Sequence, residues 1–414
     1  MMDGMKRRTF FGTAAVGAAP LGMAAQNNKA QSGMKIARVR YYASPGDAAM
    51  RQQKAPGLFN QSTNVVVVET DSGLTGIGEG GAKDTMEQCA AAVIGMDPFR
   101  IQDIWQVLFR GYFYPAGREK LHAMGAIDMA LWDLKAKALG VPLYQLLGGQ
   151  TRDHVECYAT SYPPKGSYKD TAAACVGEGY RAFRIGPADS QPWDRFEMLQ
   201  KTARICREVR EGVGKDGAWA VDFHTRFDLA DAVKLAGLIE NLGPYFVEDL
   251  VRSENPGVYK TLRGLVKVPI AVGEQFGARW DMNELIEGRL IDYCRATVPN
   301  VGGITEFVKI AALCETHYVG LIPHFTGPIS EAALVHLCCA FSGPALMEML
   351  PRVSKGVPYL PKSFDFRDGK LWPNQRPGLG VEFDAAQLQL ISEITEKSQP
   401  TPIYRRPDGS VTNW

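Results

Sequence analysis

Short apolar runs that alternate with amphipathic stretches fill the middle of the chain. From about residue 152 to residue 350, an apolar run, a polar or acidic residue and a helical stretch follow one another repeatedly. The runs that we predict to be strands are 155–159, 182–185, 219–222, 245–248, 270–273, 293–297, 320–323 and 345–347. The helical stretches between them include 194–211, 229–241, 280–287, 305–315 and 330–340. Strands that alternate with helices in this number predict a parallel α/β barrel.

The residues before the barrel show strands first and helices afterwards. Apolar or alternating runs predict strands at 35–42, 64–70 and 74–79, and Asp71-Ser72-Gly73 predicts the turn of a hairpin. Helical patterns follow at 85–94, 98–109 and 121–139. This order predicts a separate α+β unit of moderate size.

The residues after the barrel are too many for a simple tail. Between Pro351 and Trp414, the sequence Arg367-Asp368-Gly369 predicts a hairpin. We expect this segment to pack back on the α+β unit.

The N-terminal residues have the pattern of an export signal. Lys6-Arg7-Arg8-Thr9-Phe10-Phe11 is followed by an uncharged stretch of small and apolar residues that runs to Ala25. Such a signal is too short to remain inserted in a membrane, and the arginine pair is similar to the twin-arginine class. We therefore predict an export signal and linker over residues 1–33 and a periplasmic or exported protein. A frayed helix on a cytosolic enzyme, or a start at Met34 that leaves the protein in the cytoplasm, are the alternatives.

Composition narrows the function classes without naming one. The 414 residues are 45% hydrophobic and 22% charged, which is typical of a soluble globular protein with a sizeable core. Lys plus Arg is 46 and Asp plus Glu is 45, so the net charge of +1 argues against a nucleic-acid partner. The eight cysteines show no paired spacing, and we expect buried free thiols rather than disulfides.

Three acidic residues occupy the ends of successive predicted barrel strands. Asp222 ends Ala-Trp-Ala-Val-Asp, Glu248 ends Tyr-Phe-Val-Glu, and Glu274 follows Ile-Ala-Val-Gly. The C-terminal ends of barrel strands meet at one mouth, where three carboxylates repel one another unless a hard cation lies between them. The pattern predicts one Mg²⁺ per subunit on these oxygens. The alternative is that each acid only caps a helix or is solvated.

Two histidines fall in the same register as the acids. His224 lies two residues past Asp222, and His324 ends Val-Gly-Leu-Ile-Pro-His. At this rim they are better interpreted as proton-transfer groups than as core residues. Glu348, in the eighth strand, is expected to hydrogen-bond a bound carboxylate if it is itself protonated.

Four motifs give the chain a resemblance to a known family. Residues 130–149 (ALWDLKAKALGVPLYQLLGG), 222–226 (DFHTR), 301–306 (VGGITE) with 322–328 (IPHFTGP), and 377–382 (PGLGVE) occur in the expected order. With these the chain resembles the enolase superfamily, and within it the mandelate racemase subgroup and its acid-sugar dehydratases such as the galactonate and mannonate dehydratases.

The resemblance implies a fold and a division into domains. It implies a modified (β/α)₇β barrel over residues 151–350 and an N-terminal capping domain over 34–150. Residues 351–414 would complete the capping domain.

The resemblance also implies a chemistry. Mg²⁺ would lie on Asp222, Glu248 and Glu274, and His324 would be the base that removes the proton α to a carboxylate. The metal-stabilised enediolate would then lose its β-hydroxyl, with His224 as the acid. The product of an aldonate or aldarate would be a 2-keto-3-deoxy acid.

Two departures from the family pattern bear on this prediction. Relatives that can remove the α-proton from either face of the substrate carry Lys-x-Lys at the end of the second strand. This chain has Phe183-Arg184-Ile185-Gly186 there. That difference favours dehydration over racemisation. The aspartate that pairs with the base is replaced by Thr297, which can hydrogen-bond but cannot stabilise an imidazolium by charge.

The expected function is therefore Mg²⁺-dependent dehydration of an acid sugar, with two alternatives. One is a racemase or epimerase of a 2-hydroxy or related carboxylate, and the other is a catalytically weakened sugar-acid binding protein. Arg184 and Arg226 are candidates for binding substrate carboxylate or hydroxyl groups. We expect a small-molecule partner, no stable membrane insertion of the mature chain, and a homo-oligomer.

Overall fold

A four-stranded sheet with three helices forms the first half of the fold. The computed structural model describes residues 33–45, 62–189, 192–325, 327–351, 356–361, 363–399 and 401–412. The strands are β1 (Ile36–Ala43), β2 (Val65–Thr70) and β3 (Thr75–Glu79), and the helices are α3 (Lys83–Val93), α4 (Ile101–Arg110) and α5 (Arg118–Leu139). Antiparallel β2 and β3 confirm the predicted hairpin. The predicted export signal lies outside the described residues.

Two glycines let the longest helix lie directly on this sheet. A Cβ atom at Gly76 of β3 would lie 2.0 Å from the carbonyl oxygen of Ala130, and one at Gly78 would lie 2.0 Å from that of Ala126. Only glycine fits such a close approach of helix backbone to strand. The Thr-Gly-Ile-Gly-Glu sequence of β3 therefore fixes the position of α5.

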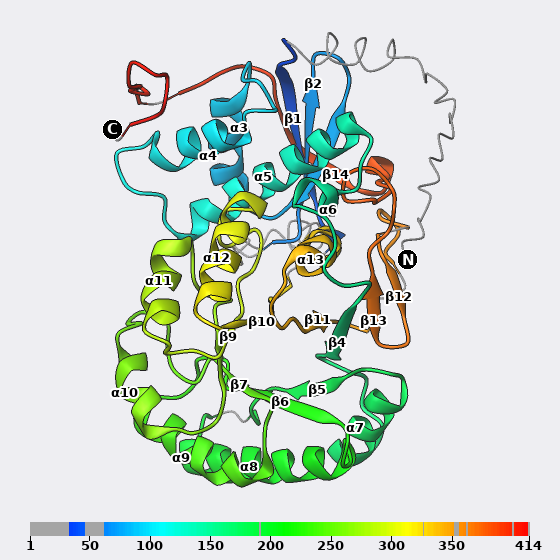
Figure 1. Cartoon of the computed structure of the whole chain (residues 1–414), viewed down its shortest axis with the longest axis vertical. Helices are drawn as coiled ribbons and strands as arrows, with labels where there is room; N and C mark the ends of the chain where they lie inside the picture. Colours follow the sequence, from blue (N-terminus) through cyan, green and yellow to red (C-terminus); the bar gives the residue numbers. More distant parts are fainter. Residues whose placement is uncertain are drawn as a thin grey trace, which may run out of the picture. The chain divides into compact units, whose positions relative to one another are not determined.

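Eight parallel strands and their helices form the barrel, as predicted (Figure 1). The strands are β4 (Val155–Ala159), β5 (Ala182–Ile185), β6 (Ala218–Asp222), β7 (Phe246–Glu248), β8 (Ile270–Val272), β9 (Tyr293–Cys294), β10 (Gly320–Leu321) and β11 (Met347–Met349). The helices are α7 (Tyr168–Gly177), α8 (Arg195–Gly212), α9 (Leu229–Ile239), α10 (Val258–Leu265), α11 (Arg279–Glu287), α12 (Ile304–Thr316) and α13 (Pro328–Ala340). The barrel closes where β11 pairs with β4 and where Leu321 forms a parallel bridge with Ala345. A short helix, α6 (Leu143–Leu146), connects the first half of the fold to β4.

The prediction of the barrel elements is wrong in two details. The last strand lies at Met347–Met349 instead of 345–347, because Ala345 bridges β10 before the ladder with β4 begins. Helices α7 and α10 were not predicted. Helix α7 is mostly small residues and has no strong apolar period, and α10 is only eight residues long, with Tyr259 and Leu262 buried.

The C-terminal segment divides its strands between the two halves of the fold. Strands β12 (Asp365–Arg367) and β13 (Lys370–Trp372) form the expected hairpin, but β13 pairs with β4 of the barrel. Strand β14 (Gln389–Ile394) pairs with β1 and completes the first sheet (Figure 1). Only the second of these pairings follows the expectation that the segment packs on the α+β unit.

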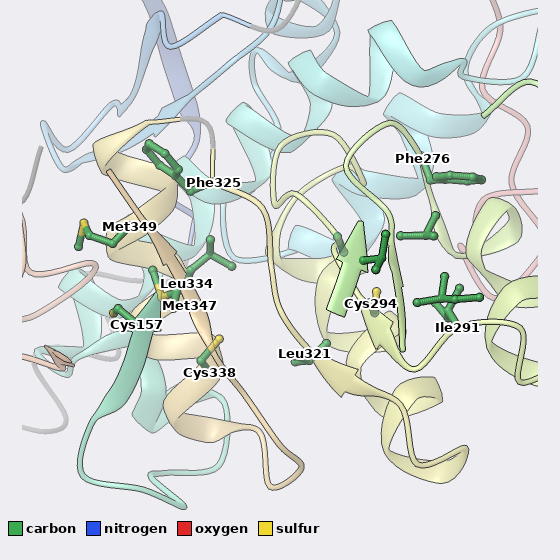
Figure 2. Packing of buried hydrophobic residues seen from close by; sticks show 14 of the residues in the cluster. Cys157, Phe276, Ile291, Cys294, Leu321, Phe325, Leu334, Cys338, Met347 and Met349 are labelled. Atoms are coloured by element: carbon green, nitrogen blue, oxygen red, sulfur yellow. The ribbon is translucent and has the colours of Figure 1, made fainter. Parts of the chain in front are cut away.

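The cores have the composition that the apolar runs predict. Figure 2 shows Cys157 of β4, Leu334 and Cys338 of α13, and Met347 of β11 gathered between helix and strands. All eight cysteines are buried and free, which confirms the prediction of free thiols. Among the described residues, no helix is long and apolar enough to cross a membrane.

Buried carboxylates from the first half of the fold cap helices of the barrel. Glu79 accepts hydrogen bonds from the backbone N–H groups of Ile329 and Ser330 at the start of α13, at 3.1 and 2.7 Å. Asp128 of α5 accepts one from Thr305 N at the start of α12, at 2.9 Å. These acids satisfy helix N–H groups that have no partner within the helix.

Asp128 makes the stability of the protein depend on pH. Burial raises the pKa of Asp128 to about 7, so the folded state holds its proton at pH values where an unfolded chain releases it. The free energy of unfolding therefore falls as the pH rises from about 4 to about 7, and above pH 7 this group changes it no further. Asp128→Asn removes this dependence, so we expect the free energy of unfolding of the variant, relative to wild type, to be higher at pH 8 than at pH 6 by about 1 kcal/mol. Thermal midpoints at both pH values test this, with Asp153→Asn at an exposed position as the control.

Candidate functional site

Three neighbouring barrel strands bring the predicted acids together. Asp222 ends β6 and Glu248 ends β7, and the two are direct partners in the parallel ladder. Glu274 follows β8, which pairs with β7. The strands that carry them are apolar and fully packed, so the acids are the first polar groups at the C-terminal mouth. The three acids lie close together because each follows a short apolar strand and the three strands are neighbours in the barrel.

Two arginines lie inside this cluster. Arg184 of β5 donates from Nη1 to Asp222 Oδ2 at 2.5 Å and to Glu248 Oε2 at 3.1 Å. Its Nη2 donates to Glu348 Oε1 at 2.8 Å. Arg295, which is fully buried just past β9, donates to Glu248 Oε1 at 2.7 Å and to Glu348 Oε2 at 2.8 Å. The two guanidinium groups thus hold Glu248 and Glu348 between them.

Glu348 is therefore a carboxylate and not the protonated acid that the sequence suggested. Its burial alone would raise the pKa, but Arg295 and Arg184 lower the pKa of Glu348 below its usual range. The reason is that β9 and β5 direct arginines at it from two sides, as the hydrogen bonds show. A bound carboxylate would be repelled by Glu348, so any contact between them runs through the arginines.

Negative charge exceeds positive charge in the cluster. Asp249, next to Glu248, is 2% exposed, and its Oδ2 has no hydrogen-bond partner among the described residues. Five carboxylates, those of Asp222, Glu248, Asp249, Glu274 and Glu348, face the two guanidinium groups. Burial raises the pKa of Asp222, Glu248 and Asp249, and the neighbouring carboxylates raise each further. This arrangement lacks positive charge.

The oxygen donors of this cluster fit a metal ion. One oxygen each of Glu248, Asp249 and Glu274 lie within 4.8 Å of one another, which is a spacing that a single ion can bridge. Asp222 is held next to them by Arg184, which bonds both Asp222 and Glu248. Carboxylate oxygens alone, without nitrogen or sulfur ligands, favour a hard cation such as Mg²⁺.

Both predicted histidines flank Glu274. The Nε2 atom of His324 lies 3.4 Å from Glu274 Oε2, and that of His224 lies 3.8 Å from Glu274 Oε1. The Nδ1 atom of His324 is hydrogen-bonded to Thr297 Oγ1 at 2.9 Å. Burial lowers the pKa of His324, so its ring is neutral at physiological pH. The side chain of His224 is 52% exposed at the mouth, which gives the two imidazoles different environments.

A polar cavity of about 380 Å³ opens beside the cluster. Arg184, Asp222 and His224 line one side of it. Arg226, the second arginine that the sequence suggested, also lines it and forms an ion pair with Asp189. A second cavity, of about 640 Å³, adjoins it at Arg226. The predicted site residues therefore share one mouth.

Three features of the site do not follow from the strand-end pattern. Asp249 directly follows Glu248 and could have been found as an acidic pair. Arg295 lies within the predicted strand 293–297. A charged residue in such an apolar run indicates that a buried residue of opposite charge pairs with it. Tyr158 of β4, whose hydroxyl accepts a hydrogen bond from Arg295, gave no signal in the sequence.

Arg295 is expected to be essential for stability. Replacing it by Met leaves Glu248 and Glu348 buried next to each other with one guanidinium fewer, and breaking a buried pair in this way costs about 3–5 kcal/mol. The matched control is Arg263→Met, because Arg263 makes a bidentate but half-exposed pair with Asp292. We expect the control to cost about 1 kcal/mol or less in urea denaturation. Equal losses for the two variants would contradict the prediction.

The chain matches the family models of two enzyme domains. Residues 45–148 match the mandelate racemase/muconate lactonizing enzyme N-terminal domain, and residues 167–387 match the enolase C-terminal domain-like model. The second match alone spans more than half of the chain.

Individual proteins align with most of the chain. It is 33% identical over 389 residues to a D-mannonate dehydratase of Caulobacter sp. (strain K31), with 84% of this chain and 94% of the relative covered. It is 34% identical over 366 residues to a D-galactonate dehydratase of Pectobacterium atrosepticum, with 84% and 95% covered. A solved structure of an enolase from Pantoea ananatis with bound D-gluconate and Mg superposes with a TM-score of 0.75 at 28% identity. That superposition covers 91% of this chain and 99% of the other.

Proposed function

The chain belongs to the enolase superfamily, in its mandelate racemase/muconate lactonizing enzyme group, and we propose that it is a hydro-lyase that dehydrates an acid sugar to a 2-keto-3-deoxy acid. The observation that carries the proposal is the pair of imidazoles on Glu274, beside a carboxylate cluster with excess negative charge. The His324 side chain is 17% exposed, and the His224 side chain is 52% exposed at the mouth. Elimination of water needs one base and one acid, and this pair supplies both.

His324 is the proposed base. Thr297 holds its Nδ1 at 2.9 Å, which leaves Nε2 as the nitrogen that faces the carboxylate cluster and the substrate. Because burial lowers its pKa, the ring is unprotonated and can accept the proton from the carbon next to the substrate carboxylate. The neutral Thr297 orients the ring without stabilising its charged form.

His224 is the proposed acid. Its exposed side chain lies on the other oxygen of Glu274 and lines the cavity that receives the substrate. From there, its Nε2 would give a proton to the departing β-hydroxyl group. The two rings lie near different oxygens of Glu274 and differ in solvent exposure.

Mg²⁺ is the proposed cofactor, held by Glu248 and Glu274 with Asp222 or Asp249. When bound, Mg²⁺ supplies positive charge to the substrate carboxylate, which acidifies the neighbouring C–H bond. Arg184 and Arg295 hold Glu248 in place, and their charges oppose the rise in its pKa that burial causes. The similar structure of the Pantoea ananatis enolase, which contains Mg and D-gluconate, supports this assignment.

Racemisation is disfavoured by the residue at the end of β5. A two-base racemase needs a proton acceptor on each face of the substrate. Arg184 stands at this position and is bound by three carboxylates, and a guanidinium stays protonated in proteins. The end of β5 therefore offers no second base.

The proposal is tested by a screen of acid sugars for 2-keto product. Purified protein is incubated with aldonates and aldarates in the presence of excess Mg²⁺, and products are detected as semicarbazones. We expect product from at least one acid sugar, and its loss after chelation of the metal. Epimerised substrate without 2-keto product would favour the racemase alternative. Saturable binding without turnover would favour the sugar-acid binding protein.

We also propose that residues 1–33 are a twin-arginine signal and that the enzyme acts outside the cytoplasm. The arginine pair and the uncharged stretch to Ala25 support this. A twin-arginine route carries folded proteins, which suits a chain whose eight cysteines are free and buried. Fractionation of cells and mass determination of the mature N-terminus test it.

A further inference from the structure

We propose that the site selects monocarboxylate acid sugars over dicarboxylates, and that Asp189 enforces this choice by neutralising Arg226. The inference rests on the proposed function, since it concerns the end of the substrate that lies away from the reacting carboxylate. An aldonate ends there in a neutral CH₂OH group, and an aldarate ends in a second carboxylate.

The cavity next to the carboxylate cluster is lined by side chains that carry hydroxyl groups. Its lining includes the side chains of Thr160, Ser161, Tyr162 and Tyr168. Hydroxyl groups both donate and accept hydrogen bonds, so they can pair with the hydroxyls of a polyol chain. None of them supplies the full positive charge that a desolvated carboxylate needs.

Both arginines that line this cavity are already paired. Arg184 is bound by Asp222, Glu248 and Glu348, at 2.5 to 3.1 Å. Arg226 donates to Asp189, whose side chain is 78% exposed at the mouth. Among the described lining residues, then, no guanidinium lacks a carboxylate partner.

The adjoining cavity repeats this pattern, because each arginine described in its lining has a carboxylate partner. Arg195 pairs with Asp231 at 3.4 Å, and Arg252 pairs with Glu254 at 2.5 Å. Arg226, which lines both cavities, also lies over the ring of Trp193 at 5.9 Å. Each arginine that lines either cavity among the described residues therefore has a carboxylate partner.

A second substrate carboxylate would have to displace Asp189 or lie beside it. Either choice leaves one carboxylate without its cation, because Arg226 carries a single charge. Sites that lack a partner for a charged group reject it by roughly 10- to 100-fold or more. A terminal hydroxyl meets no such penalty.

The test compares acids that differ only at C6. The matched pairs are D-gluconate with D-glucarate, D-mannonate with D-mannarate, and D-galactonate with galactarate. We expect kcat/KM for the monoacid to exceed that for its diacid by at least about tenfold. A diacid that is turned over as well as or better than its partner would overturn the inference and leave the proposed function intact.

Affinity provides a second measurement that does not depend on turnover. Isothermal titration with the same pairs should give at least about tenfold tighter binding of the monoacid. If the monoacid binds selectively but no product forms, the inference stands and the proposed function fails. Equal or tighter binding of the diacid, or binding of neither acid in any pair, would overturn the inference.

Asp189→Asn tests the residue itself. The change leaves Arg226 with uncompensated positive charge, so the diacid-to-monoacid ratio of kcat/KM and of affinity should rise about tenfold. Glu284→Gln is the control, because it removes the same charge from an exposed pair with Lys260, 2.7 Å away in another part of the barrel. The control should keep the wild-type ratio. An unchanged ratio in Asp189→Asn would remove Asp189 from the role of specificity determinant.

Discussion

Replacing Glu248 by Gln is expected to lower kcat by at least about 10³-fold and to abolish tight Mg²⁺ binding. Glu248 is the centre of the carboxylate cluster, because it accepts hydrogen bonds from both Arg184 and Arg295 and contributes to the group that can hold a metal. The amide of Gln has one accepting oxygen, and its NH₂ group would face a guanidinium donor. Steady-state kinetics and isothermal titration with Mg²⁺ measure the two effects.

The control for this prediction is Glu211→Gln. Glu211 pairs with Lys169 at 3.2 Å on the surface, so its change removes the same charge without touching the site. We expect its kcat and Mg²⁺ affinity to match those of wild type. Circular dichroism of both variants separates a loss of chemistry from a loss of fold. A folded Glu248→Gln enzyme with wild-type turnover would contradict the assignment of the site.

His324→Asn is expected to lower exchange of the substrate α-proton with solvent deuterium by about 10²- to 10⁴-fold. Asn keeps a polar group near Thr297 and Glu274 but has no nitrogen that can accept the proton. Proton NMR of the substrate in D₂O follows the exchange directly. Wild-type exchange in this variant would remove His324 from the role of base.

Two further variants separate the role of His324 from those of its neighbours. Thr297→Val keeps the imidazole and removes the hydroxyl that holds Nδ1, so we expect a smaller loss, of about tenfold or less. His224→Asn should retain α-proton exchange while product formation falls, because the proposed acid acts after the proton has left. A variant of His224 that loses exchange as completely as His324→Asn would contradict this division of roles.

The sequence could predict the barrel because its strands are short, apolar and regularly spaced. Each run is bounded by a polar residue, so the strand ends, and with them Asp222 and Glu248, could be placed before any contact was known. Glu274 and His324 could be placed in the same way, because each directly follows a predicted strand. The hairpins at Gly73 and Gly369 were marked by their turn residues.

The electrostatics of the site could not be predicted in the same way. Arg295 and Arg184 lie at strand ends like the acids, but the pattern does not tell which side chains they reach across the barrel. Their contacts with Glu348 determine that this residue is ionised, which reverses the sequence-based expectation. The pairing of Asp189 with Arg226 joins two different loops and leaves no trace in local periodicity.

The division of the C-terminal segment has a similar cause. Both β13 and β14 are short and carry few buried residues, so their patterns do not select a partner. Strand β13 pairs with Val155 and Glu156, the residues of β4 that neither β5 nor β11 pairs with, and β14 pairs with the edge of β1 that β2 leaves open. The positions of β13 and β14 therefore depend on which strands of the rest of the fold have unpaired backbone groups.

The most direct test of the account is the fate of hydrogen when the wild-type enzyme turns over an acid sugar in D₂O. In the proposed reaction the C2–H and C3–O bonds break, water leaves, and the resulting enol takes one solvent deuteron at C3 as C2 becomes a ketone. NMR of the product should therefore show a 2-keto-3-deoxy acid with a single deuterium at C3. Recovery of substrate with deuterium and inverted configuration at C2, and no 2-keto acid, would contradict dehydration as the activity.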